Sequence, residues 1–169
     1  MKMMRSLLPL AAAFVLAAAG CGDTPVSVRA SSLVGDWRTD PVPITLTTPD
    51  GQRALVQKQT WSFTANGDYL RRGWLVDEPA GKAYVDFIDE GSFTVPRDGV
   101  LELTPRRAFY RAPTQFVTTA EPQPSSGLVQ PYGFAVRDGV LSVTPGCPAN
   151  ANCLPPVTVR LHPVPVLVN

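Results

Sequence analysis

Apolar and polar residues alternate along almost the whole of residues 33–162, and this two-residue period constrains the fold more than any other feature. No window keeps the i, i+3, i+4, i+7 spacing of an amphipathic helix, so the pattern predicts β-strands. Turn signals separate the strands at Pro49-Asp50-Gly51, Asn66-Gly67, Pro79-Ala80-Gly81, Asp98-Gly99 and Asp138-Gly139. This spacing is typical of consecutive antiparallel hairpins.

The alternation predicts strands near residues 33–38, 42–48, 54–65, 68–77, 83–96, 100–104, 107–118, 131–137, 140–144 and 156–162. Antiparallel strands in such number must protect the edges of their sheet, and closure into a barrel does so. We therefore expect an all-β chain that forms a single antiparallel up-and-down β-barrel of about 8–10 strands. The alternative is a two-sheet β-sandwich.

The hairpin around Asn66-Gly67 makes the sharpest prediction about a site. As a two-residue turn, it places on one face the opposed pairs Phe63–Leu70, Trp61–Arg72 and Gln59–Trp74. We take Trp61, Phe63, Leu70, Arg72 and Trp74 as candidate ligand-binding residues on the inner face of the barrel.

In that register Arg72 lies on the buried face, where an unpaired charge costs several kcal/mol. Its partner would be the ring of Trp61, a carboxylate of Asp86 or Glu102, or the anionic head group of a ligand. The remaining alternative is a shifted register, in which Arg72 faces solvent.

Two similar segments, FTVPRDGVLELTP (93–105) and FAVRDGVLSVTP (134–145), predict two similar hairpins. A two-residue loop at Asp138-Gly139 places Phe134 opposite Val143 and Val136 opposite Leu141. The first segment is one residue longer, so we expect a three-residue loop, Arg97-Asp98-Gly99, with a bulge.

The N-terminus has the pattern of an export signal. Lys2 and Arg5 precede an uncharged run, Leu7–Gly20, which is short for a membrane span and ends in Ala-Ala-Ala-Gly before Cys21. This ending resembles the lipobox of bacterial lipoproteins, and the resemblance implies that Cys21 carries the lipid. We expect a signal peptide over 1–20, a flexible tether over 21–32 and one domain over 33–169.

The segment Leu33-Val34-Gly35-Asp36-Trp37 resembles the Gly-x-Trp start of lipocalins and bacterial lipocalin-like domains. Phe63-Thr-Ala-Asn-Gly-Asp-Tyr69 and the later hairpins are also similar to that family. The resemblance implies that Gly35 and Trp37 close one end of the barrel. It further implies that Arg160, in the last strand, stacks on Trp37; the alternative is that Arg160 is exposed to solvent.

Cysteine usage agrees with export. With Cys21 assigned to lipid, Cys147 and Cys153 remain, and in an oxidising compartment we expect a disulfide between them. The chain is expected in the bacterial cell envelope, anchored to the outer membrane.

Charge and motifs narrow the function classes. A net charge of +1 argues against nucleic-acid binding. Lone His162, the acidic group Asp86, Asp89 and Glu90, and the basic group Arg106, Arg107 and Arg111 are interpreted as surface residues. No motif predicts catalysis, a cofactor or a metal.

Two hypotheses remain. Either the barrel binds a small apolar or amphipathic ligand, or its interior is filled and its outer face contacts a protein partner of the envelope.

Overall fold

The computed structural model describes residues 30–48, 50–147 and 155–165. Its strands are β1 (Gly35–Thr39), β2 (Val42–Thr48), β3 (Gly51–Phe63), β4 (Asp68–Asp77), β5 (Lys82–Arg97), β6 (Val100–Tyr110), β7 (Gln123–Pro124), β8 (Gln130–Arg137), β9 (Val140–Pro145) and β10 (Val159–Pro163). The strands expected at 100–104 and 107–118 are one strand, β6, because the pairing with β5 continues past Pro105 through a bulge.

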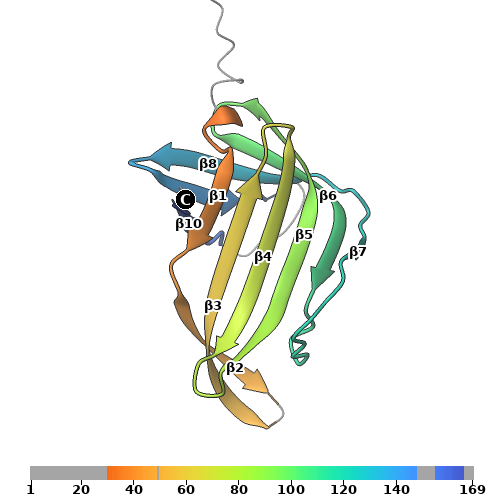
Figure 1. Ribbon diagram of the computed structural model, residues 1–169. Helices are drawn as coiled ribbons and strands as arrows, with labels where there is room; N and C mark the ends of the chain where they lie inside the picture. Colours follow the sequence, from red (N-terminus) through yellow and green to blue (C-terminus); the bar gives the residue numbers. More distant parts are fainter. Residues whose placement is uncertain (1–29, 49, 148–154, 166–169) are drawn as a thin grey trace, which may run out of the picture.

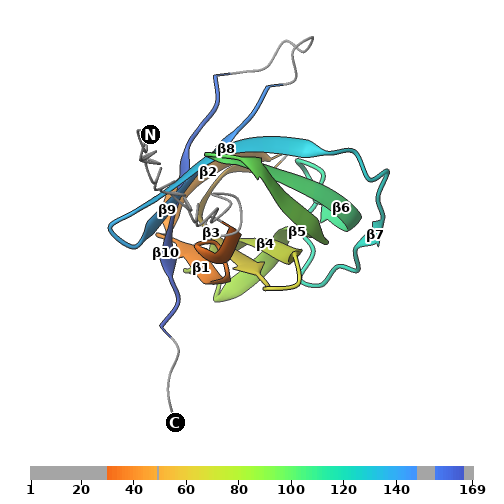
Figure 2. The same cartoon turned by 90° about the horizontal axis from the view of Figure 1, so that it is seen from above.

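Eight antiparallel strands close into a barrel, which Figure 2 shows from above. The order runs β1, β10, β9, β8, β6, β5, β4, β3, and β1 closes the ring by pairing with both β10 and β3. The predicted up-and-down barrel is therefore confirmed, and the two-sheet sandwich is wrong. Two further strands lie outside the ring: β2 pairs with β3, and β7 pairs with β6.

The barrel wall is uneven in height. β3, β4 and β5 have 13, 10 and 16 residues, whereas β8, β9 and β10 have 8, 6 and 5. In Figure 1 the long strands extend with β2 well below the short ones. Below the ends of the short strands, Ile44 and Leu46 of β2 and Phe116 from the segment after β6 pack against the inner surface of β3–β5.

The upper end of the barrel is filled by apolar side chains. A helical turn at Ala30-Ser31 leads into β1, and Leu33 below it is fully buried. The indole Nε1 of Trp37, which is 6% exposed, donates to the carbonyl of Leu33 at 2.8 Å. Around them pack Trp61, Phe63, Tyr69, Phe93, Val95, Leu101, Leu103, Leu141, Val143 and Leu161.

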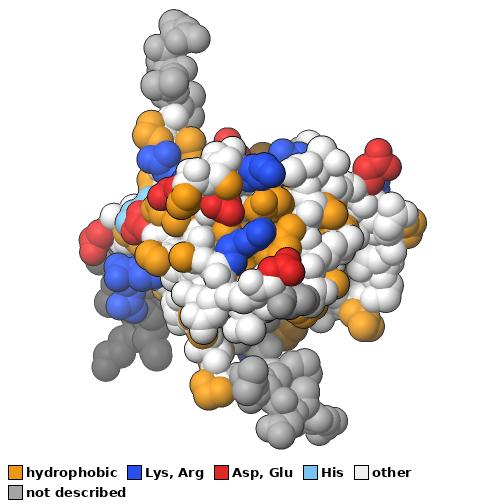
Figure 3. All heavy atoms as spheres, turned by 90° about the horizontal axis from the view of Figure 1, so that it is seen from below, with side chains coloured by type: hydrophobic (Ala, Val, Ile, Leu, Met, Phe, Trp, Pro, Cys, Tyr) orange, Lys and Arg blue, Asp and Glu red, His pale blue; other side chains and the backbone are white. Residues whose placement is uncertain are grey.

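A second, smaller core lies at the lower end. Leu55, Leu75 and Tyr84 form it, and Phe116 from the segment after β6 packs against Tyr84 with ring centroids 5.1 Å apart. The backbone NH of Val85 holds this segment by donating to the carbonyl of Val117 at 2.8 Å. Seen from below, apolar side chains gather in the middle of this end, with charged side chains at their border (Figure 3).

The two similar hairpins follow the predicted pairing. Asp138 and Gly139 have φ of 51° and 73°, as a two-residue type I′ turn requires, and Phe134 lies opposite Val143. In the first hairpin the loop is also two residues, because Arg97 pairs with Val100. The expected three-residue loop is wrong: the extra residue lies within β5, where Val95 and Pro96 oppose Leu101. Proline suits this bulge because it has no NH to donate.

Candidate functional site

The loop between β3 and β4 decides which side chains enter the barrel. Thr64 and Asp68 are joined by a backbone hydrogen bond of 2.9 Å, which leaves the three residues Ala65–Gly67 as the loop. Gly67 has a φ of 83°, the left-handed conformation typical of the last residue of such a loop. Phe63 therefore lies opposite Tyr69, and Trp61 opposite Arg71.

This register corrects the predicted site. A shift of one residue exchanges the two faces of a strand, so Leu70, Arg72 and Trp74 point out of the barrel. Arg72 is exposed, as the alternative of a shifted register implied. Trp61 and Phe63 do face inward and are 3% exposed. The buried cation is Arg71, one residue before the one predicted.

Arg71 is paired with a carboxylate inside the barrel. Arg71 is 7% exposed and lies directly opposite Asp89 of β5, which is fully buried. The Nε of Arg71 donates to Oδ2 of Asp89 at 3.1 Å, and Nη2 donates to the same oxygen. Tyr69 and Tyr110 donate their hydroxyl groups to Asp89 at 2.8 and 3.1 Å. The carboxylate is thus fully compensated by charge and hydrogen bonds.

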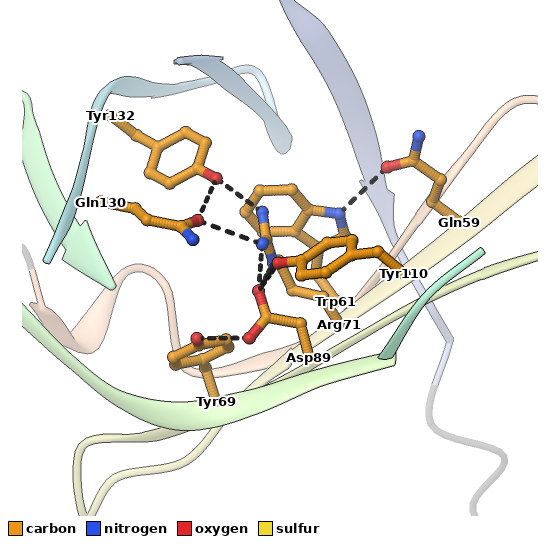
Figure 4. A network of polar contacts seen from close by, with 8 residues as sticks. All are labelled: Gln59, Trp61, Tyr69, Arg71, Asp89, Tyr110, Gln130 and Tyr132. Atoms are coloured by element: carbon orange, nitrogen blue, oxygen red, sulfur yellow. Dashed lines mark hydrogen bonds and ion pairs between the residues drawn. The ribbon is translucent and has the colours of Figure 1, made fainter. Parts of the chain in front are cut away.

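The guanidinium also contacts the other side of the barrel, as Figure 4 shows. Its Cζ lies 4.8 Å from the ring centroid of Trp61, and Nη1 donates to the hydroxyl of Tyr132 at 2.8 Å. Tyr132 in turn donates to the Oε1 of Gln130 at 3.1 Å. Because Tyr132 and Gln130 belong to β8, the network links the long wall to the short wall.

Burial within this network raises the pKa of tyrosine hydroxyls. For Tyr69, loss of solvent contributes most, followed by the hydrogen bond and the negative charge of Asp89, and the pKa lies well above its ordinary value. The pKa of Tyr110 is raised for the same leading reason, burial, and by the charge of Asp89. Both hydroxyls therefore remain protonated donors at neutral pH.

Beside the network lies a cavity of about 410 Å³. It opens where β6, β8, β9 and β10 begin or end, below the packed upper core and against the inner surface of the long strands. Its walls are mostly aromatic and apolar, with two carboxamides among them: Gln59, Trp61, Arg71, Phe87, Tyr110, Gln130, Tyr132, Pro145 and Val159. The Oε1 of Gln59 accepts from Trp61 at 3.4 Å, and among the described residues no acceptor faces its amide donors.

The predicted acidic and basic groups meet one another. Asp86 pairs with Arg111 at 3.2 Å, and Glu90 with Arg107 at 3.1 Å. Arg106 pairs with Asp68 at 2.7 Å. The interpretation of these residues as simple surface charges is wrong for Asp89, which is buried, and for Arg111, whose side chain is 8% exposed.

The three residues expected to close the barrel do not lie together. Trp37 points into the upper core, and Gly35 begins β1 with a φ of 134°. Arg160 is exposed and does not stack on Trp37, so the alternative of a solvated Arg160 is the one observed. Leu161 is fully buried and points inward, so the two-residue period of β10 turns Arg160 to the outer face.

The residues expected to carry lipid and a disulfide are not all described. Cys21 and Cys153 lie outside the described residues, so lipidation and the Cys147–Cys153 disulfide stay predictions. Within the described ranges, no three histidine, cysteine or acidic side chains group closely enough to hold a metal ion. No helix in this part of the chain is long and apolar enough to cross a bilayer.

Comparison of the chain with known protein families and with curated proteins finds no match. The site is therefore interpreted from its geometry and the chemistry of its residues.

Proposed function

We propose that this chain is a lipid-anchored envelope protein whose barrel binds a small, neutral, amphipathic ligand. The observation that carries the proposal is the cavity of about 410 Å³ between Trp61, Phe87 and Tyr110. Its volume is within the range of small-molecule sites, and its lining combines aromatic walls with a few polar groups, as such sites do.

The Arg71–Asp89 pair argues for a neutral ligand. An unpaired arginine would attract a carboxylate or a phosphate, but here Asp89 cancels its charge at hydrogen-bond distance. An anionic ligand would gain little from the pair and would lose its own hydration. The free amide donors of Gln59 suit a carbonyl or ether oxygen on an otherwise apolar molecule.

The test is native mass spectrometry of protein purified from its own envelope. Val159 is partly buried at the cavity wall and lies outside the polar network. Val159→Trp should fill the cavity and lose the co-purifying mass. Arg160→Trp adds the same side chain to the outer face and is the matched control. Absence of any bound mass in the wild-type protein, or its retention by Val159→Trp, would contradict ligand binding.

Anchoring is tested separately. If Cys21 carries the lipid, Cys21→Ser should move the protein from the detergent phase to the aqueous phase on phase separation. Unchanged partition would show that the chain is held by other means.

The second candidate is a non-enzymatic protein that binds an envelope partner through its outer face. Dense packing of the upper half of the barrel favours it. The interior there is filled by side chains that are fully buried: Leu101, Leu103, Leu141 and Leu161. Co-purification of a protein partner without a small molecule would favour this candidate.

A further inference from the structure

The outer face of β1, β3 and β4 carries three cations around a tryptophan. Arg38 lies opposite Thr60, and Thr60 lies opposite Arg72, so the two arginines flank one threonine. Lys58 lies opposite Trp74 in the next row. Because neighbouring strands are about 4.8 Å apart, the three charged residues begin within about 10 Å of one another.

These three cations lack the carboxylate partner that four other arginines of the described residues have. Arg71, Arg106, Arg107 and Arg111 each pair with a carboxylate, whereas no described carboxylate pairs with Arg38, Lys58 or Arg72. The nearby acids have other partners: Asp40 contacts His162 at 3.3 Å, and Asp36 accepts from Ser62 at 2.5 Å. Even with Asp36 and Asp40 counted against Arg38, Lys58 and Arg72, the patch has an excess of one positive charge (3 − 2).

A hollow of about 490 Å³ lies in the middle of this patch. It forms where the chain leaves β1 at Asp40 and Pro41 before β2 begins, and Trp74 forms part of its wall. Trp74 is partly exposed and points away from the barrel interior, opposite in direction to Trp61. The hollow is thus separate from the ligand cavity.

We infer that this cationic hollow, which Arg38, Lys58 and Trp74 line and which Arg72 flanks beside Thr60, binds the phosphate-bearing head group of an anionic membrane lipid. Arginine presents paired donors that match phosphate oxygens, and lysine adds a compact charge. Tryptophan has an apolar ring with one polar NH, a combination that favours the head-group region of a bilayer.

The choice of a membrane lipid rests on the proposed anchoring. The eight residues 22–29 can span at most roughly 26–29 Å, so the barrel can turn this face toward the bilayer that holds Cys21. Each cation near an anionic surface strengthens binding roughly fivefold. Three cations together should contribute about two orders of magnitude, less at high salt.

Vesicle co-sedimentation of the full chain carrying Cys21→Ser tests the inference without the lipid anchor. Vesicles of phosphatidylglycerol mixed with phosphatidylcholine should bind the protein more tightly than vesicles of phosphatidylcholine alone. Adding Arg38→Gln, Lys58→Gln and Arg72→Gln should weaken binding to the anionic vesicles between 10-fold and 100-fold. The variant should stay folded, because none of the three side chains makes a described ion pair or hydrogen bond.

The matched control removes two arginines and one lysine elsewhere. Lys82, Arg97 and Arg137 are exposed at hairpin ends, also without described ion pairs. Their replacement by glutamine should change vesicle binding by less than about threefold. All variants carry the same N-terminus, so its contribution is common to them.

Three results would overturn the inference: equal binding to both vesicle types, equal loss in the two triple variants, or binding of inorganic phosphate at the hollow without any vesicle binding. Val159→Trp in the same Cys21→Ser chain should bind vesicles like its parent. Failure of the ligand cavity and failure of the lipid site are therefore distinguishable.

Discussion

Arg71 and Asp89 lie directly opposite each other on neighbouring strands, and both point into the barrel. The pair is nearly excluded from solvent, with exposed fractions of 7% and 0%. On its other side Arg71 lies over the ring of Trp61, so one row of residues across β3, β4 and β5 forms the polar centre of the barrel. This row separates the packed upper half from the cavity below.

The first prediction concerns how much this pair contributes to the free energy of unfolding of the protein. Arg71→Met should cost about 3–5 kcal/mol, because it leaves Asp89 buried without its cation. Asp89→Leu should cost a similar amount for the opposite reason. The double variant should be far less destabilised than the sum of the two, since no unpaired charge remains. Its residual cost, about 1–3 kcal/mol, comes from the hydroxyl groups of Tyr69 and Tyr110 that lose their acceptor.

Urea denaturation of the four proteins measures this coupling. Additive losses would show that Arg71 and Asp89 act independently, against the geometry described.

The second prediction concerns alkaline pH. Because burial raises the pKa of Tyr69 in the folded protein, the folded state keeps a proton that the unfolded state loses above about pH 10. The stability due to this hydroxyl is therefore complete below pH 10 and declines as the pH rises above it. The expected slope is about 1.4 kcal/mol per pH unit for Tyr69. Tyr110, 55% exposed, should contribute less.

The measurement is the free energy of unfolding between pH 8 and pH 11 for wild type and Tyr69→Phe. The variant should be less stable at pH 8 but decline less steeply above pH 10. An identical slope in the two proteins would contradict the prediction.

The third prediction concerns a close approach of two strands. A Cβ atom on Gly91 would lie 2.1 Å from the backbone carbonyl oxygen of Thr104, so β5 and β6 could not keep their spacing at the bulge. Gly91→Ala should therefore destabilise the protein by about 1–3 kcal/mol. At Gly133 the nearest atom would be 3.9 Å away, so Gly133→Ala should change stability by less than about 1 kcal/mol. Thermal unfolding of both variants checks the difference.

The sequence predicted the architecture because alternation and turn residues are local signals. The Asp138-Gly139 hairpin was predicted to the residue, since a two-residue turn with two positive φ angles allows one register. Asp89 could also have been assigned to the inner face, since it shares the period of Phe93 and Val95. The pairing of Asp89 with Arg71 could not have been predicted in the same way, because it depends on the register of a different hairpin.

The one-residue error at β3–β4 shows what local patterns leave open. Asn66-Gly67 fits a two-residue turn, but Ala65 joins the loop, and Tyr69 rather than Leu70 then faces Phe63. Both registers bury aromatic residues of β3, so the hydrophobic pattern alone did not choose between them. The choice follows from tertiary contacts: only the observed register brings Arg71 to Asp89 and Tyr69 to the same carboxylate.

The last prediction tests this account of the loop. Deleting Ala65 leaves Thr64 paired with Asp68 and converts the loop into the two residues Asn66-Gly67, which strongly favour a type I′ turn. The pairing of Phe63 with Tyr69 is unchanged, so stability should change by less than about 1 kcal/mol. Deleting Leu70 instead removes a residue from the strand itself. It would turn Arg71 outward or force a compensating bulge, and should cost more than about 4 kcal/mol or prevent folding.

Urea denaturation of the two deletion variants, monitored by tryptophan fluorescence, distinguishes the positions. Similar destabilisation by both deletions would mean that Ala65 is part of the strand pairing. The inward position of Arg71 would then require a three-residue loop, and a two-residue loop could not support the same strand register.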